Sequence, residues 1–549
     1  MGAARWSALL MVAVTVLTFA PALDGEFLTW DDPLHITANP HLLPVSVESI
    51  GHFWRTPYRG EYVPLSYTFW AGEAWLAGDG DELRPALFHL GSLLLHLGCV
   101  LMVWKLLSRI VGHRGAALVG ALLFAVHPLQ VESVAWISET RGLLATLLSL
   151  GAMWWFLRYA ETSVDHAGSS GRRSRSAMLV LSTALFALAL LAKPAAVCVP
   201  LVAALLVWLV VGRLTRGVVI SLLPWFVLSI LAVVIAKSQQ PDAITSFVAP
   251  WWSRPIVAAD AIVFYWGQLL WPENLGPDYG RTPQSVLRGN WYVPLTTVLV
   301  SLLALGFVFG RSRTRAAGED GEDIEKRAII SSLPRSSMIG IAIFLAVLLP
   351  VLGFVSFGHQ GISTVADRYL YLAMFGPALI TASLLARFWR PSLVVASLGT
   401  LSLLAVVSAG QCRHWHDSES LFRHTLAVNP RSVVAHNTLG RLHQQRGEHT
   451  AAIQHFQLAL AVGDQAAMSH DNLGLVLLAE RRPADAERHF RQAVELQPNH
   501  HRARNNLGVA LAAQGKTREA AVQFDAVLSQ VPGHVSARRN RQRLRDTAQ

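Results

Sequence analysis

The sequence predicts an all-α protein in which a polytopic helical membrane domain precedes an α-solenoid of short repeats. Hydrophobic residues make up 52% of the 549 residues, and the mean hydropathy is +0.38. This composition is typical of a chain that lies largely in lipid. The C-terminal part differs, because its residues recur at a fixed interval of 34 positions.

Eleven apolar stretches are predicted as membrane spans from their length and low charge. They cover residues 5–23, 86–107, 115–127, 142–157, 177–192, 195–211, 217–236, 291–310, 337–355, 369–387 and 391–410. Two short stretches, 115–127 and 177–192, end just before a proline, so a tilted or broken helix is expected at each. The tryptophan-rich stretch 256–271 is interpreted as an interfacial helix that does not cross.

Basic residues gather in the loops on one side of these spans, which predicts that this side is cytoplasmic. The first outer loop, 24–84, instead carries ten acids against three arginines. With an odd number of spans and a cytoplasmic N-terminus, everything after residue 411 lies outside. Few lysines and many arginines and alanines suit the inner membrane of a GC-rich bacterium, with a periplasmic repeat domain; a lumenal endoplasmic reticulum protein would have the same topology.

Three dispersed cysteines, Cys99, Cys198 and Cys412, indicate neither a disulfide framework nor a metal cluster. The first apolar stretch lacks a small-residue cleavage site and is interpreted as a retained span. The net charge of +10 arises largely from the cytoplasmic loops and the arginine-rich C-terminus. A nucleic-acid partner is therefore not expected.

The segment after Asn429 carries two patterns that step by 34 residues. The recurring residues are Gly440, Gly474 and Gly508 in an L-G pair, and Phe456, Phe490 and Phe524 in an A-x3-F pattern. This period and these positions are typical of tetratricopeptide repeats, which fold as pairs of antiparallel helices. We expect the small residues to let paired helices approach and the phenylalanine to fill the space between successive repeats.

These patterns predict the domain boundaries. The membrane domain covers 1–410, a half-repeat connector covers 411–431, and the repeat domain covers 432–549, with repeats at 432–465, 466–499 and 500–533 and a C-terminal capping helix. Such an array is either a passive folding unit or a concave surface for an extended peptide or partner protein.

Ionisable side chains near the outer face are the candidates for chemistry, because charges at a bilayer are costly to keep. Asp31 and Asp32 directly follow the first span. The other candidates are His127, Glu132, Arg141, Lys193, Asp278, Tyr279, Arg281, Asp367, Arg368 and Tyr369. A carboxylate at this face can take a proton from a hydroxyl, and cations can hold a phosphate.

Each candidate also has a structural interpretation. Adjacent acids after a span can cap a helix, and Arg141 and Lys193 can snorkel from helix ends. Asp367 and Arg368 can form an ion pair, and His127 with its following proline can simply break a helix. The residues alone leave these alternatives open.

Five segments occur in order ahead of the repeats: "WDDPLHITANP", "HPLQVESVAWI", "AKPAAVCVPLV", "WPENLGPDYG" and "ADRYLYL". Together with the repeats, this series resembles the transmembrane and tetratricopeptide-repeat-containing (TMTC) family, in its bacterial branch, along nearly the whole chain. One departure is that relatives tend to have a basic residue followed by an acid after "ESVAW", whereas here Glu139 precedes Arg141.

The resemblance implies a GT-C type glycosyltransferase that uses a polyprenyl-phosphate sugar as donor, with its active site at the outer membrane face. Animal members of the family are linked to O-mannosylation of extracytoplasmic protein domains. The expected activity is therefore inverting transfer of mannose or another hexose to Ser or Thr of an extracytoplasmic protein, which the repeats present. The GT-C signature is an acidic pair in the first outer loop, where Asp31 and Asp32 lie.

The chemistry assigns expected roles to these residues. Asp31 is expected to remove the proton of the acceptor hydroxyl, and Asp32 completes the catalytic pair. Arg368, Lys193, Arg141 and His127 are the expected ligands of the donor phosphate. Supporting roles fall to Glu132, Asp367, Tyr369, Tyr279 and Arg281. The sequence assigns no cofactor, and Asp31 and Asp32 leave open a divalent metal such as Mg²⁺ or Mn²⁺.

Two other function classes compete with this one. A membrane-anchored scaffold for envelope protein complexes would need the repeats but not eleven spans. A transporter would place acids within spans and show internal symmetry, whereas the candidate charges lie mostly in loops or at span ends.

Overall fold

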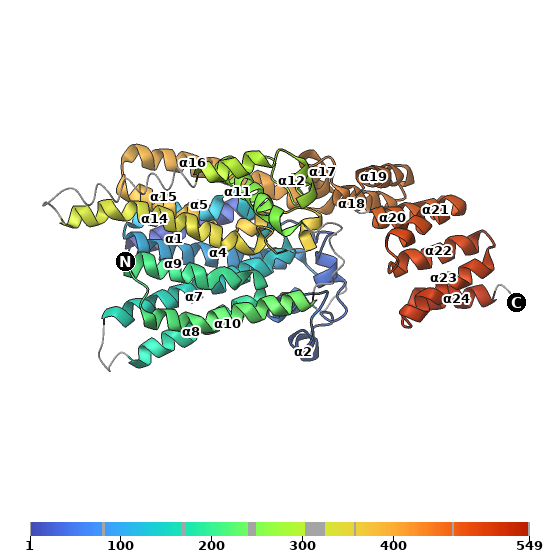
Figure 1. Cartoon of the computed structure of the whole chain (residues 1–549), viewed down its shortest axis with the longest axis horizontal. Helices are drawn as coiled ribbons and strands as arrows, with labels where there is room; N and C mark the ends of the chain where they lie inside the picture. The colour runs from blue at the N-terminus through green and yellow to red at the C-terminus, as the bar shows by residue number, and fades with distance from the viewer. Residues whose placement is uncertain are drawn as a thin grey trace. The chain divides into compact units, whose positions relative to one another are not determined.

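The computed structural model describes residues 2–78, 83–165, 172–239, 249–301, 324–355, 358–463 and 466–546 (Figure 1). The chain divides into a membrane unit, Met1–Pro277 with Arg281–Ser420, and a repeat unit, Asp278–Gly280 with Leu421–Gln549. The described residues form helices and no strand, and one isolated bridge pairs Tyr58 with Glu61. The predicted all-α fold class is confirmed.

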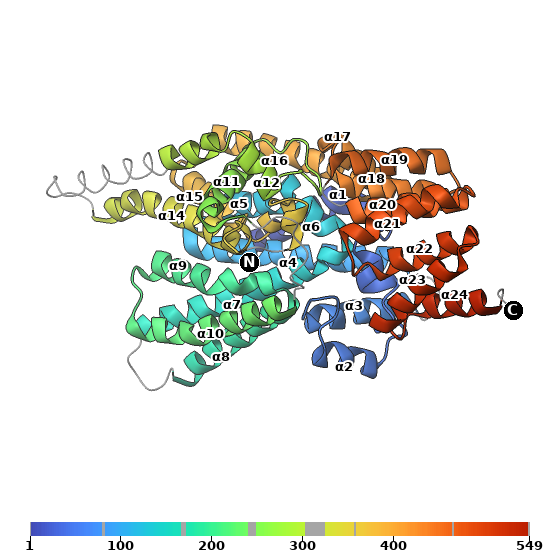
Figure 2. The same ribbon diagram turned by 45° about the vertical axis from the view of Figure 1, so that its right-hand side comes forward.

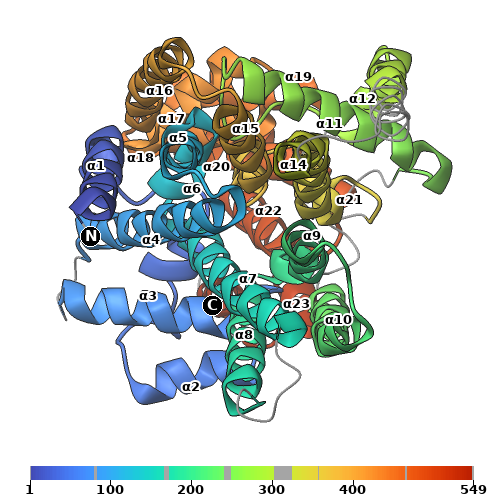
Figure 3. The same cartoon turned by 90° about the vertical axis from the view of Figure 1, so that its left-hand side faces the viewer.

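The membrane unit is a bundle of helices joined by short 3₁₀ and π turns. Its helices are α1 (Gly2–Phe19), α2 (Val47–Arg55), α3 (Pro64–Ala77), α4 (Pro85–Val111), α5 (Arg114–Val126), α6 (Val131–Ala135), α7 (Thr140–Asp165), α8 (Arg172–Ala192), α9 (Val199–Val211), α10 (Arg216–Gln239), α11 (Arg254–Leu270), α12 (Pro283–Arg288), α14 (Ile324–Leu348), α15 (Phe375–Arg387) and α16 (Pro391–Cys412). Figure 3 shows α5 and α14 nearly end-on, whereas α2 and α3 are seen from the side in the lower part of the view.

Seven helices in the described part of the chain are long and apolar enough to cross a membrane, which confirms a polytopic protein. They are Ala4–Ala22, Pro85–Val111, Ile137–Ser163, Arg173–Ala192, Pro194–Val211, Arg216–Gln239 and Pro391–Trp415. An eighth span is formed if the bent pair Arg114–Val126 and Pro128–Ala135 is counted as one. This number is smaller than the eleven spans predicted.

Shorter apolar helices lie at the three remaining predicted spans, at Tyr292–Ser301, Arg335–Val351 and Phe375–Arg387. Residues 302–310 of the predicted span 291–310, and the basic residues 311–323 after it, lie outside the described residues. The predicted span 369–387 begins too early. Asp367–Leu370 forms a 3₁₀ turn, η10, and α15 starts only at Phe375, because the charged groups of this turn are paired inside the bundle.

The predicted helix break at His127 is confirmed. His127 has an extended backbone (φ −69°, ψ 134°), and the helices on either side of it are inclined by 53°. Pro128 explains the break, because a proline disfavours the helical conformation of the residue before it. The break is followed by the turn η3 (Pro128–Gln130), by α6, which carries the candidate Glu132, and by the turn η4 (Ile137–Glu139).

The repeat unit is a row of helix pairs (Figure 2). It follows α17 (Ser418–Val428) and contains α18 (Val433–Gln445) with α19 (His449–Val462), α20 (Ala466–Ala479) with α21 (Pro483–Leu496), α22 (His501–Ala513) with α23 (Thr517–Gln530), and the last helix α24 (Val535–Asp546). Leu544 of α24 joins the apolar core formed by the repeats, so this helix covers the apolar face that the last repeat would otherwise expose.

The glycine and phenylalanine of each repeat contact each other. A Cβ atom on Gly440, Gly474 or Gly508 would lie 2.5, 2.7 or 2.5 Å from a ring carbon of Phe456, Phe490 or Phe524. The expectation that the phenylalanine fills the space between successive repeats is therefore incomplete, because its ring first packs on the glycine of its own repeat. Both rows are buried.

Candidate active site

Asp32 is fixed inside the outer loop by three hydrogen bonds. Its Oδ2 accepts from the backbone N–H of Leu28 at 2.8 Å, and its Oδ1 accepts from the N–H of Ser138 at 3.1 Å and from the Ser138 hydroxyl. Burial raises the pKa of Asp32 to about 6, against the opposing effect of these bonds. Asp32 therefore anchors its loop to Ser138 in η4.

Asp31 is the more available carboxylate of the pair. It is half-buried two residues before the π turn η2 (Pro33–Thr37), and its carboxylate makes no hydrogen bond to another described residue. Burial raises its pKa, and the nearby Arg141 and Arg368 oppose that shift. A carboxylate without a hydrogen-bond partner and beside two cations has the properties of a base that awaits a proton donor.

Glu139, in η4, is surrounded by three cations. Its Oε2 accepts from Lys193 Nζ at 2.6 Å, and its Oε1 lies 3.8 Å from both Arg141 Nε and Arg368 Nε. Glu139 is 1% exposed, so this carboxylate is stable as an anion only because the three cations compensate it. Segments far apart in the sequence, η4, the start of α7, the end of α8 and η10, thus meet at one carboxylate.

Two further carboxylates complete the cluster. Glu132 accepts the backbone N–H of Arg368 at 3.0 Å and also pairs with its guanidinium. Glu61 pairs with Arg141 and is presented by a tight turn in which Arg59 (φ 53°) and Gly60 (φ 78°) both have positive φ. Each cation of the cluster therefore has its own carboxylate partner.

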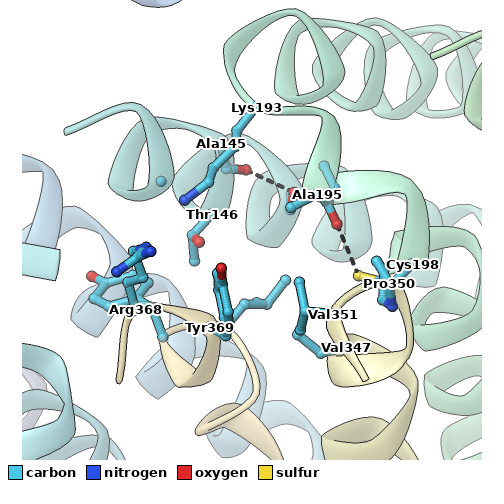
Figure 4. A pocket seen from close by; sticks show the side chains of 15 residues that line it. Ala145, Thr146, Lys193, Ala195, Cys198, Val347, Pro350, Val351, Arg368 and Tyr369 are labelled. Atoms are coloured by element: carbon cyan, nitrogen blue, oxygen red, sulfur yellow. Dashed lines mark hydrogen bonds between the residues drawn. The ribbon is translucent and has the colours of Figure 1, made fainter. Parts of the chain in front are cut away.

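A cavity of about 90 Å³ opens beside this cluster (Figure 4). Lys193, Arg368 and Tyr369 point into it from one side. The remaining lining is mostly apolar and includes Ala195, Ala196, Val347, Val351 and Leu372. The cavity therefore has a cationic end and an apolar wall, which suits an amphipathic ligand whose head is anionic.

Aromatic rings connect the outer loop with Arg368. Trp30 stacks on Trp136 with ring centroids 5.1 Å apart, and Trp415 lies 6.1 Å from Trp136. The Arg368 guanidinium lies 5.5 Å from the Trp136 ring and 5.0 Å from the Tyr369 ring. These cation–π contacts, together with Glu132, hold the guanidinium in one orientation.

Several predicted residues lie away from the cluster. Both ring nitrogens of His127 contact backbone groups, Nε2 with the carbonyl of Leu269 at 3.1 Å and Nδ1 with the N–H of Leu129 at 3.3 Å. The geometry thus gives His127 the helix-breaking role that the residues alone left open. Tyr279 belongs with Asp278 to the repeat unit, where Asp278 accepts from the Ser432 hydroxyl at 2.5 Å.

Arg281 supports the site from a distance. It pairs with Asp260 of α11, and its carbonyl accepts from Thr364 N–H at 2.8 Å. The hydroxyl of Tyr265, also on α11, accepts from the N–H of Ala366 at 3.1 Å. These bonds hold residues 364–366, which lead into the buried Asp367 and then Arg368.

Two central residues, Glu61 and Glu139, were not among the predicted site residues. Glu139 had a signal in the sequence, since it lies two positions before Arg141 at the predicted helix start. Glu61 follows an Arg-Gly pair that is typical of a tight turn. Neither signal shows which cation the carboxylate reaches.

A divalent metal held by the aspartate pair does not fit these residues. Both oxygens of Asp32 are taken by Leu28 and Ser138, which leaves only Asp31 as a free ligand. In the described ranges no three His, Cys, Asp or Glu side chains are grouped as a metal site.

The chain is similar to a repeat family and to several curated proteins. A tetratricopeptide repeat family model matches residues 403–467 and 472–535. The mouse protein O-mannosyl-transferase TMTC4 is 26% identical over 82% of this chain, and the Caenorhabditis elegans protein O-mannosyl-transferase F38B6.6 is 24% identical over 79% of it. The resemblance to the TMTC family is confirmed. The chain spans 66% of the length of the mouse TMTC4 protein and 59% of the nematode one.

Solved structures align with the chain only loosely. The crystal structure of ArnT from Cupriavidus metallidurans, bound to undecaprenyl phosphate, is 15% identical to this chain. The alignment covers 88% of this chain and 79% of the ArnT chain, with a TM-score of 0.35. A score this low does not inform the site, whose interpretation depends on the residues themselves.

Proposed function

We propose that the protein is an inverting GT-C type glycosyltransferase that moves mannose or another hexose from a polyprenyl-phosphate donor to Ser or Thr of an extracytoplasmic protein. The observation that carries this proposal is the unbonded carboxylate of Asp31 beside the cations around Glu139. The naming of the TMTC relatives as protein O-mannosyl-transferases supports the reaction class and the choice of sugar.

The cavity beside Lys193 and Arg368 supports binding of a lipid-linked phosphate. A phosphate between these two cations would be held electrostatically, and the apolar wall formed by residues such as Val347 and Val351 would take the first isoprene units. The carboxylate partners of the cations keep them charged and in place while the site is empty. Because phosphate must compete with those partners, binding is selective for a charged head group.

The transfer step follows from these positions. The acceptor hydroxyl attacks the anomeric carbon, the new C–O bond forms as the bond from that carbon to the phosphate oxygen breaks, and the hydroxyl proton passes to Asp31. The departing polyprenyl phosphate gains negative charge, which Lys193, Arg368 and Arg141 stabilise. Asp32 does not exchange protons with the substrate in this scheme. It positions Asp31 through its bonds to Leu28 and Ser138.

The acceptor is proposed to be a protein because the chain carries tetratricopeptide repeats, which form surfaces for extended peptides. The proposed setting is a bacterial inner membrane with a cytoplasmic N-terminus and periplasmic repeats. The cluster of three carboxylates and three cations favours an enzyme over a scaffold, since an anchor does not need buried charges that are costly to assemble.

Intact-mass glycoproteomics of envelope proteins tests the proposal. Cells of the native host would carry the wild-type protein, no protein, Asp31→Asn or Glu48→Gln. Glu48 is an exposed acid of the same outer loop, so Glu48→Gln controls for the loss of one negative charge. We expect hexose-bearing proteins to disappear in the null strain and with Asp31→Asn, and to persist with Glu48→Gln.

Two results would contradict the proposal. Unchanged protein glycosylation in the null strain would exclude protein O-glycosylation and favour the scaffold, or a lipid or glycan acceptor. Full activity of Asp31→Asn, with the variant present at wild-type level in the membrane, would exclude Asp31 as the base.

A further inference from the structure

The first two repeats each contain a pair of histidines whose rings face each other. In the first repeat, Nδ1 of His436 on α18 lies 3.0 Å from Nδ1 of His455 on α19. In the second, Nδ1 of His470 on α20 lies 2.8 Å from Nδ1 of His489 on α21. The pairs occupy the same positions, because 436 and 470, and likewise 455 and 489, are 34 residues apart.

The third repeat has no histidine at the two corresponding positions, 504 and 523. Arg504 and Gln523 replace the two histidines, and their side chains lie 3.5 Å apart. The helix pair α22 and α23 nevertheless folds like the two before it (Figure 2). A histidine pair is therefore not needed to hold the two helices of a repeat together, which leaves the two pairs without a structural requirement.

The first pair shows which nitrogen carries a lone pair. Nε2 of His436 lies 3.2 Å from the carbonyl oxygen of Pro430, and a carbonyl only accepts, so Nε2 carries the hydrogen. Nδ1 of His436 then presents a lone pair toward His455. The space between the two Nδ1 atoms holds one proton in the resting pair, and a metal ion can replace this proton.

The distances suit a chelated divalent ion. Two imidazole nitrogens on one tetrahedral zinc ion, each at about 2.05 Å, are about 3.3 Å apart. The separations of 3.0 and 2.8 Å need only a small rotation of the rings to reach this value. His455, His470 and His489 are half-buried rather than enclosed, so water can reach each pair.

We propose that each histidine pair is a binding site for a divalent transition metal such as Zn²⁺, with His436 and His455 as ligands of one ion and His470 and His489 as ligands of the other. Imidazole nitrogen is a preferred ligand of zinc, copper and nickel. In the described residues no larger group of metal-binding side chains surrounds either pair, so water completes each coordination sphere. The ion would crosslink the two helices of its repeat.

The surroundings of the two pairs differ. The ring of His443 stacks on His455 at 5.3 Å, and His443 itself pairs with Glu448. His489 has Arg488 and Asp485 as its charged neighbours, and Asp485 is already paired with arginines. The first site therefore has an imidazole beside it that can shield the ion, whereas the second faces water more directly.

Zinc binding by the full chain tests the proposal. The protein would be purified in detergent without a histidine tag, freed of metal with a chelator, and titrated with Zn²⁺ by calorimetry. One variant, His436→Arg with His455→Gln, places the residue pair of the third repeat in the first; His470→Arg with His489→Gln does the same in the second. His41→Gln with His52→Gln is the control, because these rings stack at 4.0 Å on the outer loop.

We expect two zinc ions per chain for the wild type and the control, one for each single-repeat variant, and none above background when both pairs are replaced. Absence of zinc uptake by the wild type, or uptake unchanged after replacement of both pairs, would overturn the proposal. If a replacement lowers the helical content, the single substitutions His455→Gln and His489→Gln provide the same test. None of these readouts depends on glycosyl transfer, so the proposal stands or fails separately from the enzymatic one.

Discussion

An ion pair of the candidate site in the membrane unit and an ion pair near the end of the repeat unit lie in opposite surroundings. In the membrane unit, the pair of Arg368 with Glu132 has side chains that are 8% and 1% exposed. In the repeat unit, the pair of Arg541 with Asp525 has side chains that are 23% and 54% exposed. The first pair is removed from water and the second remains in it.

The difference shows where a substitution will matter. Burying charges costs several kcal/mol each unless partners compensate them, so a network such as Glu132, Glu139 and Arg368 is not expected to persist for stability alone. Exposed pairs contribute at most about 1 kcal/mol. Function in this chain is therefore expected to concentrate in the buried network, and stability of the repeats in their apolar contacts.

The largest effect is expected from Arg368→Met. The change leaves Glu132 and Glu139 buried without one of their cations, which costs about 3–5 kcal/mol by comparison with other broken buried pairs. It also removes a proposed phosphate ligand, so transfer is lost. Thermal unfolding in detergent and glycoproteomics measure the two effects. The double change Arg368→Met with Glu132→Gln should recover part of the stability and none of the activity; recovery of activity would contradict the assigned role.

In the repeat unit, the largest effect is expected from its apolar contacts. A Cβ atom on Gly474 would lie 2.7 Å from the buried ring of Phe490, so Gly474→Ala forces the two helices of the second repeat apart. Such overpacking costs about 1–3 kcal/mol, of which alanine's higher helix propensity returns up to about 1 kcal/mol. Loss of helical circular dichroism on heating measures the change.

The matched control is Gly533→Ala, because no atom lies within 4 Å of the Cβ position there. Equal stability of the two variants would show that the glycine row is not a packing requirement. A loss confined to Gly474→Ala would confirm that close approach of the helices sets this position.

The proposed transfer should depend on pH through Asp31, the proposed base. Burial raises the pKa of Asp31, and raises that of Asp32 to about 6. A base works only when ionised, so activity is present above its raised pKa and falls about tenfold per pH unit below it. Initial rates measured from pH 4 to pH 8 should therefore begin to fall at a higher pH than for an exposed aspartate. A rate that stays constant down to pH 4 would contradict a raised pKa for the base.

Periodicity made the repeat unit predictable. Three glycines and three phenylalanines at an interval of 34 residues identify helix pairs because each repeat buries the same atoms. The membrane helices were predictable in the same way from apolar length. The ends of the helices were less predictable. Whether Asp367 and Arg368 continue a span depends on partners such as Glu132, which lies 236 residues from Arg368 in sequence.

The candidate site was predictable in its residue types but not in its pairing. Asp31, Lys193, Arg141 and Arg368 were expected from their positions near the outer face. The three cations meet around one carboxylate, and Asp31 interacts electrostatically with two of them. Glu139 and Glu61 were missed because an acid two positions from a basic residue in sequence is usually exposed on the surface. Only the folded arrangement of η4, α7 and η10 makes Glu139 the centre of the cluster.

The smallest effect is expected from Asp525→Asn, which removes an exposed ion pair of the repeat unit. Arg541 Nε donates to Asp525 Oδ1 at 2.8 Å and links α23 to the last helix, α24. Because both groups reach water, the expected loss of unfolding free energy is below about 1 kcal/mol, and 1 M salt should abolish the difference from wild type. Thermal unfolding at low and high salt measures this. A loss as large as that of Gly474→Ala, or one that persists in high salt, would mean that the last helix depends on charge as the buried cluster does.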